Sequence, residues 1–461
     1  MAILMQRSLA PSVLAIAAAL ALASYGCVFE NKCVGAGVTR GADGKCTATG
    51  PMMDAGTSTD AGTRDGGALD SAADLDSGPP AVDSGPAEIV VEVAAGAAHL
   101  CARTNLGAVY CRGHNGEGQL AAGDTLAHAG LQPVVFDRAV ASIAGTHTSV
   151  CAVSGLPAAY CWGGNANGQV GDGLTAAQIT TPFHLPFGNV VAMASSFANT
   201  CMTASGGGAT QCWGRNDVGQ LGFDSGGADV TSPAMPVQWD SGSGARSLEF
   251  VTEIAIGDRH ICFRTVGATN NVLCAGENMN GQLGVMGHAS SSLALRVPGL
   301  SDVRSIAAAG QHACAVEGES VYCWGDNMNG QVDPTAPGAS LGSPTLVAAV
   351  TGARQVVTGM DSSCALLTSG EVKCWGARMY GGIGDGIVDG TVTTPKIVVG
   401  LTGIRQLSSS FVELVCALDD SGVVSCWGSD AASLLGGGTT SAVFPDTVVL
   451  HSLPVVISML P

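Results

Sequence analysis

Cysteine is the residue type with the clearest chemistry in this 461-residue sequence, which contains 17 cysteines. Fourteen of them recur as seven pairs, and each pair could hold a metal ion or form a disulfide. Zinc-binding pairs usually sit two to four residues apart at a turn, whereas here 9 to 12 positions separate the partners. His99, His260 and His312 stand two residues before a first cysteine, where other pairs have Asn199 or Ser362. We therefore expect disulfides and no metal site.

The cysteine pairs belong to a longer repeat with a period of about 50 residues. Each unit runs through a β-rich stretch, a cysteine, a hairpin, a second cysteine and usually Trp-Gly. A glycine-rich turn such as GNANGQVGDG at 164–173 follows, and a looser stretch leads into the next unit. This pattern gives about four short strands per unit, the content of one propeller blade. We predict an all-β, seven-bladed β-propeller over residues 88–461.

The repeat resembles that of the regulator of chromosome condensation family, whose unit carries A-G-x-x-H, V-Y-x-W-G-x-N and G-Q-L-G. The resemblance covers residues 88–461 and implies a closed ring of seven blades. Its paired cysteines set the chain apart from cytosolic and nuclear members and indicate an exported bacterial lipoprotein subgroup. The motif tryptophan is present in five units and is replaced by Arg112 in the first and Ala275 in the fourth. In the seventh unit SDAASLLGGG (429–438) stands where G-Q-L-G is expected.

Each cysteine pair flanks a hairpin, and residues that face each other across an antiparallel pair lie within the span of a disulfide. The expected bonds are Cys101–Cys111, Cys151–Cys161, Cys201–Cys212, Cys262–Cys274, Cys314–Cys323, Cys364–Cys374 and Cys416–Cys426. Cys33 and Cys46 could form an eighth, which leaves Cys27 as the odd cysteine.

The first 26 residues have the pattern of a signal peptide, with Arg7 before an apolar run from Leu9 to Ala23. Gly26-Cys27 resembles the end of a lipobox, which predicts that Cys27 is lipidated. Cleavage after Ala23, releasing a secreted soluble protein, is the alternative. A short cysteine-containing anchor segment (27–46) and a disordered, aspartate-rich linker (47–87) follow. We expect a cell-envelope lipoprotein that contacts the membrane only through its lipid anchor.

The charge balance and the motifs both favour binding over catalysis. A net charge of −18, from 37 acidic and 19 basic residues, lacks the basic footprint of a nucleic-acid partner. No nucleophile elbow, Walker loop or HExxH signature stands out, so we expect neither an enzyme nor a cofactor. The leading hypothesis is a monomeric envelope scaffold that binds a protein or an envelope polymer. The alternatives are a guanine-nucleotide-exchange-like regulator, implied by the resemblance, and an extracytoplasmic hydrolase or lactonase with a metal in the central channel.

Two further segments are distinctive. The third repeat carries an insertion from Phe223 to Phe250 that includes Trp239, which makes this loop a candidate binding loop. The chain ends in the apolar run VVLHSLPVVISML (448–460). We predict that this run closes the ring by pairing with the strand at Ile89–Val93, because a dangling apolar strand would promote aggregation.

Overall fold

The structure is a computed structural model with two units, residues Met1–Val82 and Asp83–Pro461. It describes residues 87–430 and 449–461, except 129, 146, 156–157, 176–177, 227–229, 268–270 and 288. In the first unit it describes two short strands, β1 (Val38–Arg40) and β2 (Cys46–Ala48), which pair antiparallel. The predictions for the signal peptide, for lipidation of Cys27 and for a bond between Cys33 and Cys46 fall outside the described residues. Within the described part of the chain, no helix is long and apolar enough to span a membrane.

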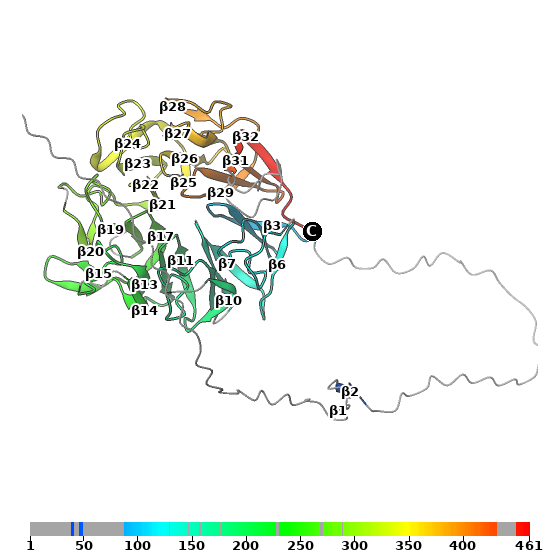
Figure 1. Ribbon diagram of the computed structural model, residues 1–461. Helices are drawn as coiled ribbons and strands as arrows, with labels where there is room; N and C mark the ends of the chain where they lie inside the picture. Colours follow the sequence, from blue (N-terminus) through cyan, green and yellow to red (C-terminus); the bar gives the residue numbers. More distant parts are fainter. Residues whose placement is uncertain are drawn as a thin grey trace, which may run out of the picture. The chain divides into compact units, whose positions relative to one another are not determined.

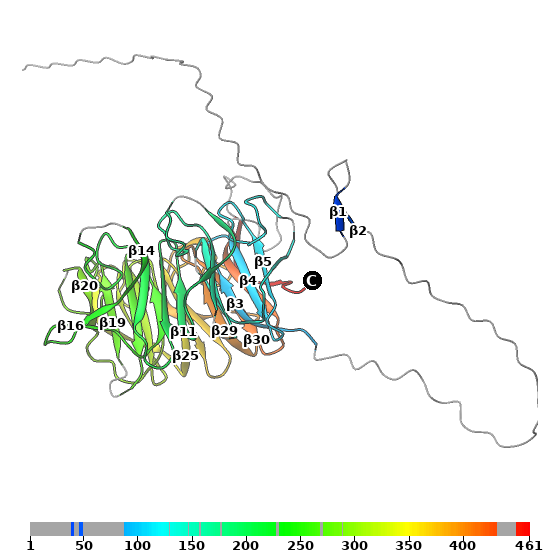
Figure 2. The same ribbon diagram turned by 90° about the horizontal axis from the view of Figure 1, so that it is seen from below.

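The second unit has seven blades, each built on four strands, and in blade 4 two further strands extend the sheet. Figures 1 and 2 show the blades arranged in a ring. The predicted fold class is confirmed. Blade 1 consists of β3 (Val90–Ala95), β4 (His99–Thr104), β5 (Val109–Gly113) and β6 (Gln132–Val134). Blade 2 consists of β7 (Val140–Ala144), β8 (Ser149–Ser154), β9 (Ala159–Gly163) and β10 (Ile179–Leu185). Blade 3 consists of β11 (Val190–Ser195), β12 (Asn199–Ala204), β13 (Thr210–Arg215) and β14 (Val230–Pro236).

Blade 4 consists of β17 (Val251–Ile256), β18 (His260–Thr265), β19 (Val272–Gly276) and β20 (Ser291–Arg296). Blade 5 consists of β21 (Val303–Ala309), β22 (His312–Glu317), β23 (Ser320–Gly325) and β24 (Leu341–Thr351). Blade 6 consists of β25 (Ala353–Thr358), β26 (Ser362–Leu367), β27 (Val372–Ala377), the 3-10 turn η1 (Met379–Gly381) and β28 (Thr391–Ile397). Blade 7 consists of β29 (Ile404–Ser409), β30 (Leu414–Asp419), β31 (Val424–Asp430) and β32 (Val449–Ile457).

The four strands of every blade form an antiparallel meander in chain order from the central channel outward, and in blade 4 two strands of the third-repeat insertion extend the sheet at its outer edge. Because the strands alternate in direction, the turn between the first and second strands lies on the same face of the ring as the turn between the third and fourth. We call this side of the ring the cavity face, because the ends of the first strands and the loops that follow them line a cavity there. The second strand of each blade is almost wholly buried, and in blade 2 every residue of both β8 and β9 is buried, because neighbouring blades cover both sides of these strands.

The seven predicted repeat disulfides are present. In each, the two cysteines face each other directly across the second and third strands, as Cys151 and Cys161 do. Their Cα atoms lie 4.0–4.1 Å apart in all seven bonds, and every sulfur belongs to a buried residue. A chain with seven buried disulfides belongs in an oxidising, extracytoplasmic environment.

The Trp-Gly and G-Q-L-G parts of the repeat meet at the junction between blades. Trp162 in blade 2 donates its indole N–H to the backbone oxygen of Gln119 in blade 1, at 2.9 Å. Trp213, Trp324, Trp375 and Trp427 make the same bond to the preceding blade, at 2.9–3.0 Å. All five indoles are fully buried. One motif therefore supplies the donor and the other the acceptor of a buried inter-blade bond.

The two units without tryptophan use other contacts. In blade 1, Arg112 donates to the backbone oxygen of Ser458 at 3.3 Å, across the junction with blade 7. In blade 4, Ala275 lies in a buried cluster with Phe223, Val237 and Leu248, all from the third-repeat insertion. Side chains of the insertion therefore pack in the same buried cluster as Ala275, the residue that replaces the motif tryptophan.

Ring closure differs from the prediction. The C-terminal run forms β32, the outer strand of blade 7, and pairs with β31; among the described strands β3 pairs only with β4. The C-terminal run therefore belongs to blade 7 and does not start another unit, and none of the described strands is shared between the first and last blades.

Blades 7 and 1 instead join through side chains. Gln406 of blade 7 accepts the N–H of Val93 in blade 1 at 3.1 Å and donates to its carbonyl at 3.2 Å. Arg405 donates to the carbonyl of Val90 at 2.8 Å. Blades 6 and 7 join in the same way, through the side chains of Arg354 and Gln355 and the backbone of β29. Val90 and Val93 also share a buried cluster with Ile457 and Met459, so the tail packs at this junction without pairing there.

Candidate functional site

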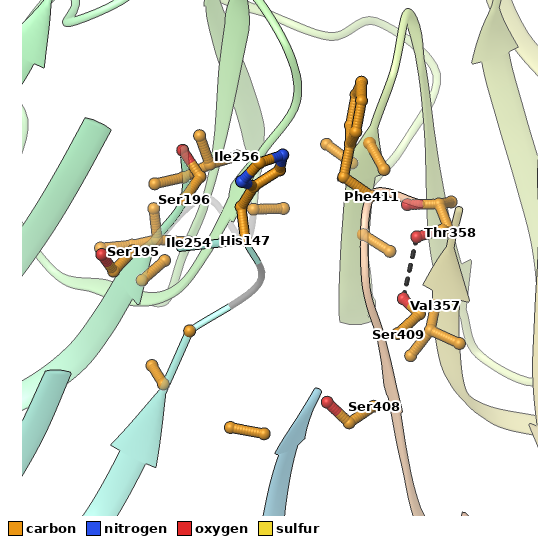
Figure 3. Close-up of a pocket in the computed structure, with 18 of the residues that line it drawn as sticks. His147, Ser195, Ser196, Ile254, Ile256, Val357, Thr358, Ser408, Ser409 and Phe411 are labelled. Carbon is orange, nitrogen blue, oxygen red and sulfur yellow. Dashed lines mark hydrogen bonds between the residues drawn. The ribbon is translucent and has the colours of Figure 1, made fainter. Parts of the chain in front are cut away.

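A cavity of about 570 Å³ lies at one end of the central channel. The first strands of all seven blades line it, so it exists only because the ring closes. Its walls combine apolar side chains, among them Ile254, Ile256 and Val357, with hydroxyls such as Ser196 and Ser408 (Figure 3). Its volume lies in the range of sites for small ligands or single large side chains.

Three rings sit at the opening of this cavity, on loops that follow first strands. His147 in blade 2 packs edge-on against Phe197 in blade 3, with ring centroids 4.7 Å apart. It also lies 5.9 Å from the ring of Phe411 in blade 7, and Figure 3 shows His147 and Phe411 side by side. Phe197 remains 49% exposed although it is large and apolar. We call these three side chains the aromatic rim.

Burial controls the charge of the rim histidine. It lowers the pKa of His147 to about 4, so the imidazole is neutral at neutral pH. Two of the three acidic residues that line the cavity are neutralised in place: Glu92 pairs with Arg103 at 2.7 Å, and Glu253 pairs with Arg264 at 2.8 Å. Burial raises the pKa of Glu253. The third, Asp258, lies on the loop after the first strand of blade 4, so most of the cavity wall is apolar or uncharged and suits apolar or aromatic groups.

The serine hydroxyls of the cavity take part in the scaffold. Ser195 shares hydrogen bonds with Ser149 at 2.7 Å and Thr200 at 2.9 Å. Ser408 accepts the backbone N–H of Ala95 at 2.9 Å. These bonds join neighbouring blades or strands. The arrangement suits recognition by shape and apolar contact.

The histidine of the A-G-x-x-H motif has a structural explanation. His99 and His260 are fully buried, and their rings lie against Gly96 and Gly257. A Cβ on Gly257 would stand 2.2 Å from Cε1 of His260, so the motif needs glycine at that position. Burial is the main cause that lowers the pKa to about 3 for His99, about 4 for His260 and about 3 for His312.

In blade 6 the corresponding place is filled by a carboxylate from blade 7. Glu413 is 2% exposed, adopts a φ of 68° and lies over Gly359. It accepts the N–H of Asp361 at 2.7 Å and the hydroxyl of Ser362. Burial raises its pKa to about 7. No pattern in the sequence pointed to this residue.

The glycine-rich turns satisfy their own polar groups. In each of blades 1 to 5 the motif glutamine accepts a backbone N–H two residues before it, as Gln169 does from Asn167 at 2.8 Å. The motif asparagine accepts the backbone N–H of the residue five positions after it, as Asn165 does from Val170 at 2.9 Å. These N–H groups are therefore occupied, and the turns act as structural loops, not as phosphate cradles.

The candidate loop residue Trp239 lies away from the aromatic rim. It belongs to β15 (Gln238–Asp240), which forms a hairpin with β16 (Ala245–Ser247) and runs parallel to β20 at Ala294. Trp239 is half-buried against the cluster around Ala275.

The aromatic rim was not predicted from the sequence, because His147, Phe197 and Phe411 follow no shared motif. Among the described residues, no group of three or more His, Cys, Asp or Glu side chains is placed to hold a metal ion.

Fold and cavity together define a rigid seven-bladed propeller with a recessed surface at the end of its channel. The model of the regulator of chromosome condensation (RCC1) repeat matches residues 90–119, in blade 1. The chain is 30% identical over 258 residues to mouse E3 ubiquitin-protein ligase HERC2, covering 53% of this chain and 5% of HERC2. It is 29% identical over 216 residues to protein pim1 of Schizosaccharomyces pombe, covering 41% of this chain and 39% of pim1.

Solved structures show the same fold. Human WBSCR16 superposes with a TM-score of 0.60 at 20% identity, covering 71% of this chain and 85% of that chain. Prp20p of Saccharomyces cerevisiae gives 0.58 at 20% identity, covering 70% and 80%. The chain thus shares its architecture with these propellers while spanning a small part of HERC2 and pim1.

Proposed function

We propose that this protein is a non-enzymatic binding protein of the cell envelope that recognises a protein partner at the aromatic rim. The observation that carries the proposal is Phe197, a large apolar side chain that is 49% exposed at the opening of a cavity that seven blades build together. An exposed large apolar side chain beside a recess is typical of an interaction site. The structure of Prp20p is described together with its binding to Gsp1p and histones. We extend protein binding, and not those partners, to this chain.

The location follows from the disulfides and from the first residues of the sequence. Seven buried disulfides favour an oxidising compartment, and the lipobox-like Gly26-Cys27 favours a lipid anchor at Cys27. The aspartate-rich residues 47–87 would then act as a spacer between the anchor and the propeller. An envelope polymer is the other ligand class that this location admits.

The test is affinity capture from envelope extracts with the immobilised mature protein, using Phe197→Ser as the rim variant. Val135→Ser is the matched control, because Val135 is also exposed but follows β6 at the opposite face. The proposal expects a defined protein that the parent and the control retain and the rim variant loses. Equal capture by all three proteins, or retention of a polysaccharide alone, would contradict it.

A further inference from the structure

The cavity face carries a second unusual feature, a row of exposed methionines. Met279, Met328 and Met379 occupy the same position of the third turn in blades 4, 5 and 6, and they are 69%, 63% and 52% exposed. The equivalent residues of blades 1, 2 and 3 are Gly116, Ala166 and Asp217. Met360, 37% exposed, lies on the neighbouring loop of blade 6. We call these four methionines the methionine arc.

The arc differs from ordinary scattered surface residues. It repeats over three consecutive blades on the face that also holds the aromatic rim. Methionine is flexible and polarisable, which suits it to contacts with varied apolar side chains, and exposed apolar surface of this extent marks an interaction site. The charges beside the arc indicate what kind of partner fits it.

At the junction of blades 3 and 4 the charges of this face are balanced. Arg259, on the first loop of blade 4, contacts Asp217 of blade 3 at 2.9 Å and Glu277 of its own blade at 3.3 Å. Arg215 contacts Asp217 at 2.7 Å. The two arginines and two carboxylates of this cluster neutralise one another, so the cluster requires no charge from a partner.

At the junction of blades 5 and 6 the balance is lost. Asp361 occupies the loop position that Arg259 has in blade 4, and it faces Asp326 of blade 5. Burial, and then repulsion from Asp326, raises the pKa of Asp361. Within the described part of the chain neither carboxylate forms a salt bridge. Met360 immediately precedes Asp361, and Met328 lies two residues after Asp326 and donates its backbone N–H to that carboxylate at 3.3 Å.

We propose that the methionine arc and the Asp326–Asp361 pair form a docking surface for a partner polypeptide segment in which a lysine or arginine is flanked by apolar side chains. The cation takes the place that Arg259 fills in blade 4, and the apolar neighbours cover the methionines. This inference goes beyond the proposed function, because it names a separate surface and the chemistry of the segment that it takes.

The test uses synthetic peptides and the mature protein, with binding measured by calorimetry. A leucine–lysine peptide is the probe; a leucine–glutamate peptide and a serine–lysine peptide of equal length are its controls. We expect the leucine–lysine peptide alone to bind measurably. Asp326→Asn/Asp361→Asn should weaken its binding at least tenfold and reduce its salt dependence. Asp224→Asn/Asp240→Asn removes the same net charge elsewhere and should change the affinity less than twofold.

Substitution of the arc gives the second arm. Met279→Ser/Met328→Ser/Met379→Ser should weaken binding at least tenfold, and Met235→Ser, an exposed methionine of blade 3, should not. Equal effects of the two aspartate variants, or binding of either control peptide, would overturn the inference. So would a dimer in sedimentation that the arc variant dissolves, because the occupant would then be a second copy. If Phe197→Ser lost peptide binding while the arc and aspartate variants kept it, the docking surface would be overturned and the rim proposal would stand. If envelope capture failed, only the rim proposal would be affected.

Discussion

Removal of one repeat disulfide should lower the free energy of unfolding by a predictable amount that is similar for all seven bonds. Cys364 and Cys374 are 10 positions apart, face each other across β26 and β27, and are buried. Closing a loop of that length lowers the entropy of the unfolded chain by an amount worth about 2.7 kcal/mol at 25 °C. Cys364→Ala/Cys374→Ala should therefore lower the free energy of unfolding by roughly that amount, while the fold is kept.

The seven bonds close separate loops, so their contributions should add. Separations of 9 residues for Cys314–Cys323 and 12 for Cys262–Cys274 imply costs that differ by only about 0.3 kcal/mol. Reduction of all seven should remove about 19 kcal/mol, which exceeds the roughly 5–15 kcal/mol of a typical domain, so the reduced propeller should unfold.

Guanidinium unfolding followed by tryptophan fluorescence measures both effects, since five indoles are buried between blades. The double alanine variants of blades 4, 5 and 6 serve as one another's controls. A fully reduced protein with the same unfolding midpoint as the oxidised one would refute the reasoning. So would a double variant that loses less than about 0.5 kcal/mol.

Four further predictions concern single positions. Burial raises the pKa of Glu413 from 4.5 to about 7, so its contribution to the free energy of unfolding is complete below pH 4.5 and is lost as pH rises through 7. Between pH 4.5 and pH 8 the free energy of unfolding of Glu413→Gln should therefore rise by about 3 kcal/mol relative to that of the parent, as measured by denaturant titration. Burial lowers the pKa of His99 to about 3, so its contribution to the free energy of unfolding is complete above pH 6.5 and is lost as pH falls. The neutral replacement His99→Gln should therefore make the free energy of unfolding fall less steeply below pH 6.5, by up to about 1.4 kcal/mol per pH unit. Gly257→Ala should cost about 1–3 kcal/mol through its clash with the His260 ring, whereas Gly130→Ala, with open space around it, should be neutral in the same unfolding assay. Cys27→Ser should move the protein from the membrane fraction to the soluble fraction if Cys27 is lipidated; an unchanged distribution would favour cleavage after Ala23.

The repeat could be predicted from the sequence because its residues act locally. A cysteine pair across a two-stranded hairpin depends only on the register of that hairpin, as for Cys151 and Cys161. Strand count and turn positions follow from similarly short-range signals. The class of fold was therefore accessible without any contact between distant residues.

The contacts between repeats were not accessible in the same way. The bond from Trp162 to Gln119 spans 43 positions, and neither motif shows that the other is its partner. Ring closure was predicted wrongly because an apolar terminal run suits either strand exchange or an outer strand. The choice depends on whether Gln406 reaches Val93, across 313 positions. The aromatic rim could not be predicted from the sequence for the same reason, because its rings come from blades 2, 3 and 7, which are distant along the chain.

The side-chain closure between blades 7 and 1 has a consequence for how the chain can be rewired. The Arg405 and Gln406 contacts repeat those of Arg354 and Gln355, so this junction matches an internal one in kind. Leu460 packs with the cluster that contains Val90, and Figure 1 shows the C-terminus near β3. A circular permutant that links residue 461 to residue 88 and opens between Gly299 and Leu300 should therefore form the same ring. In that protein blade 5 would come first along the chain, and the present first and last blades would become covalent neighbours.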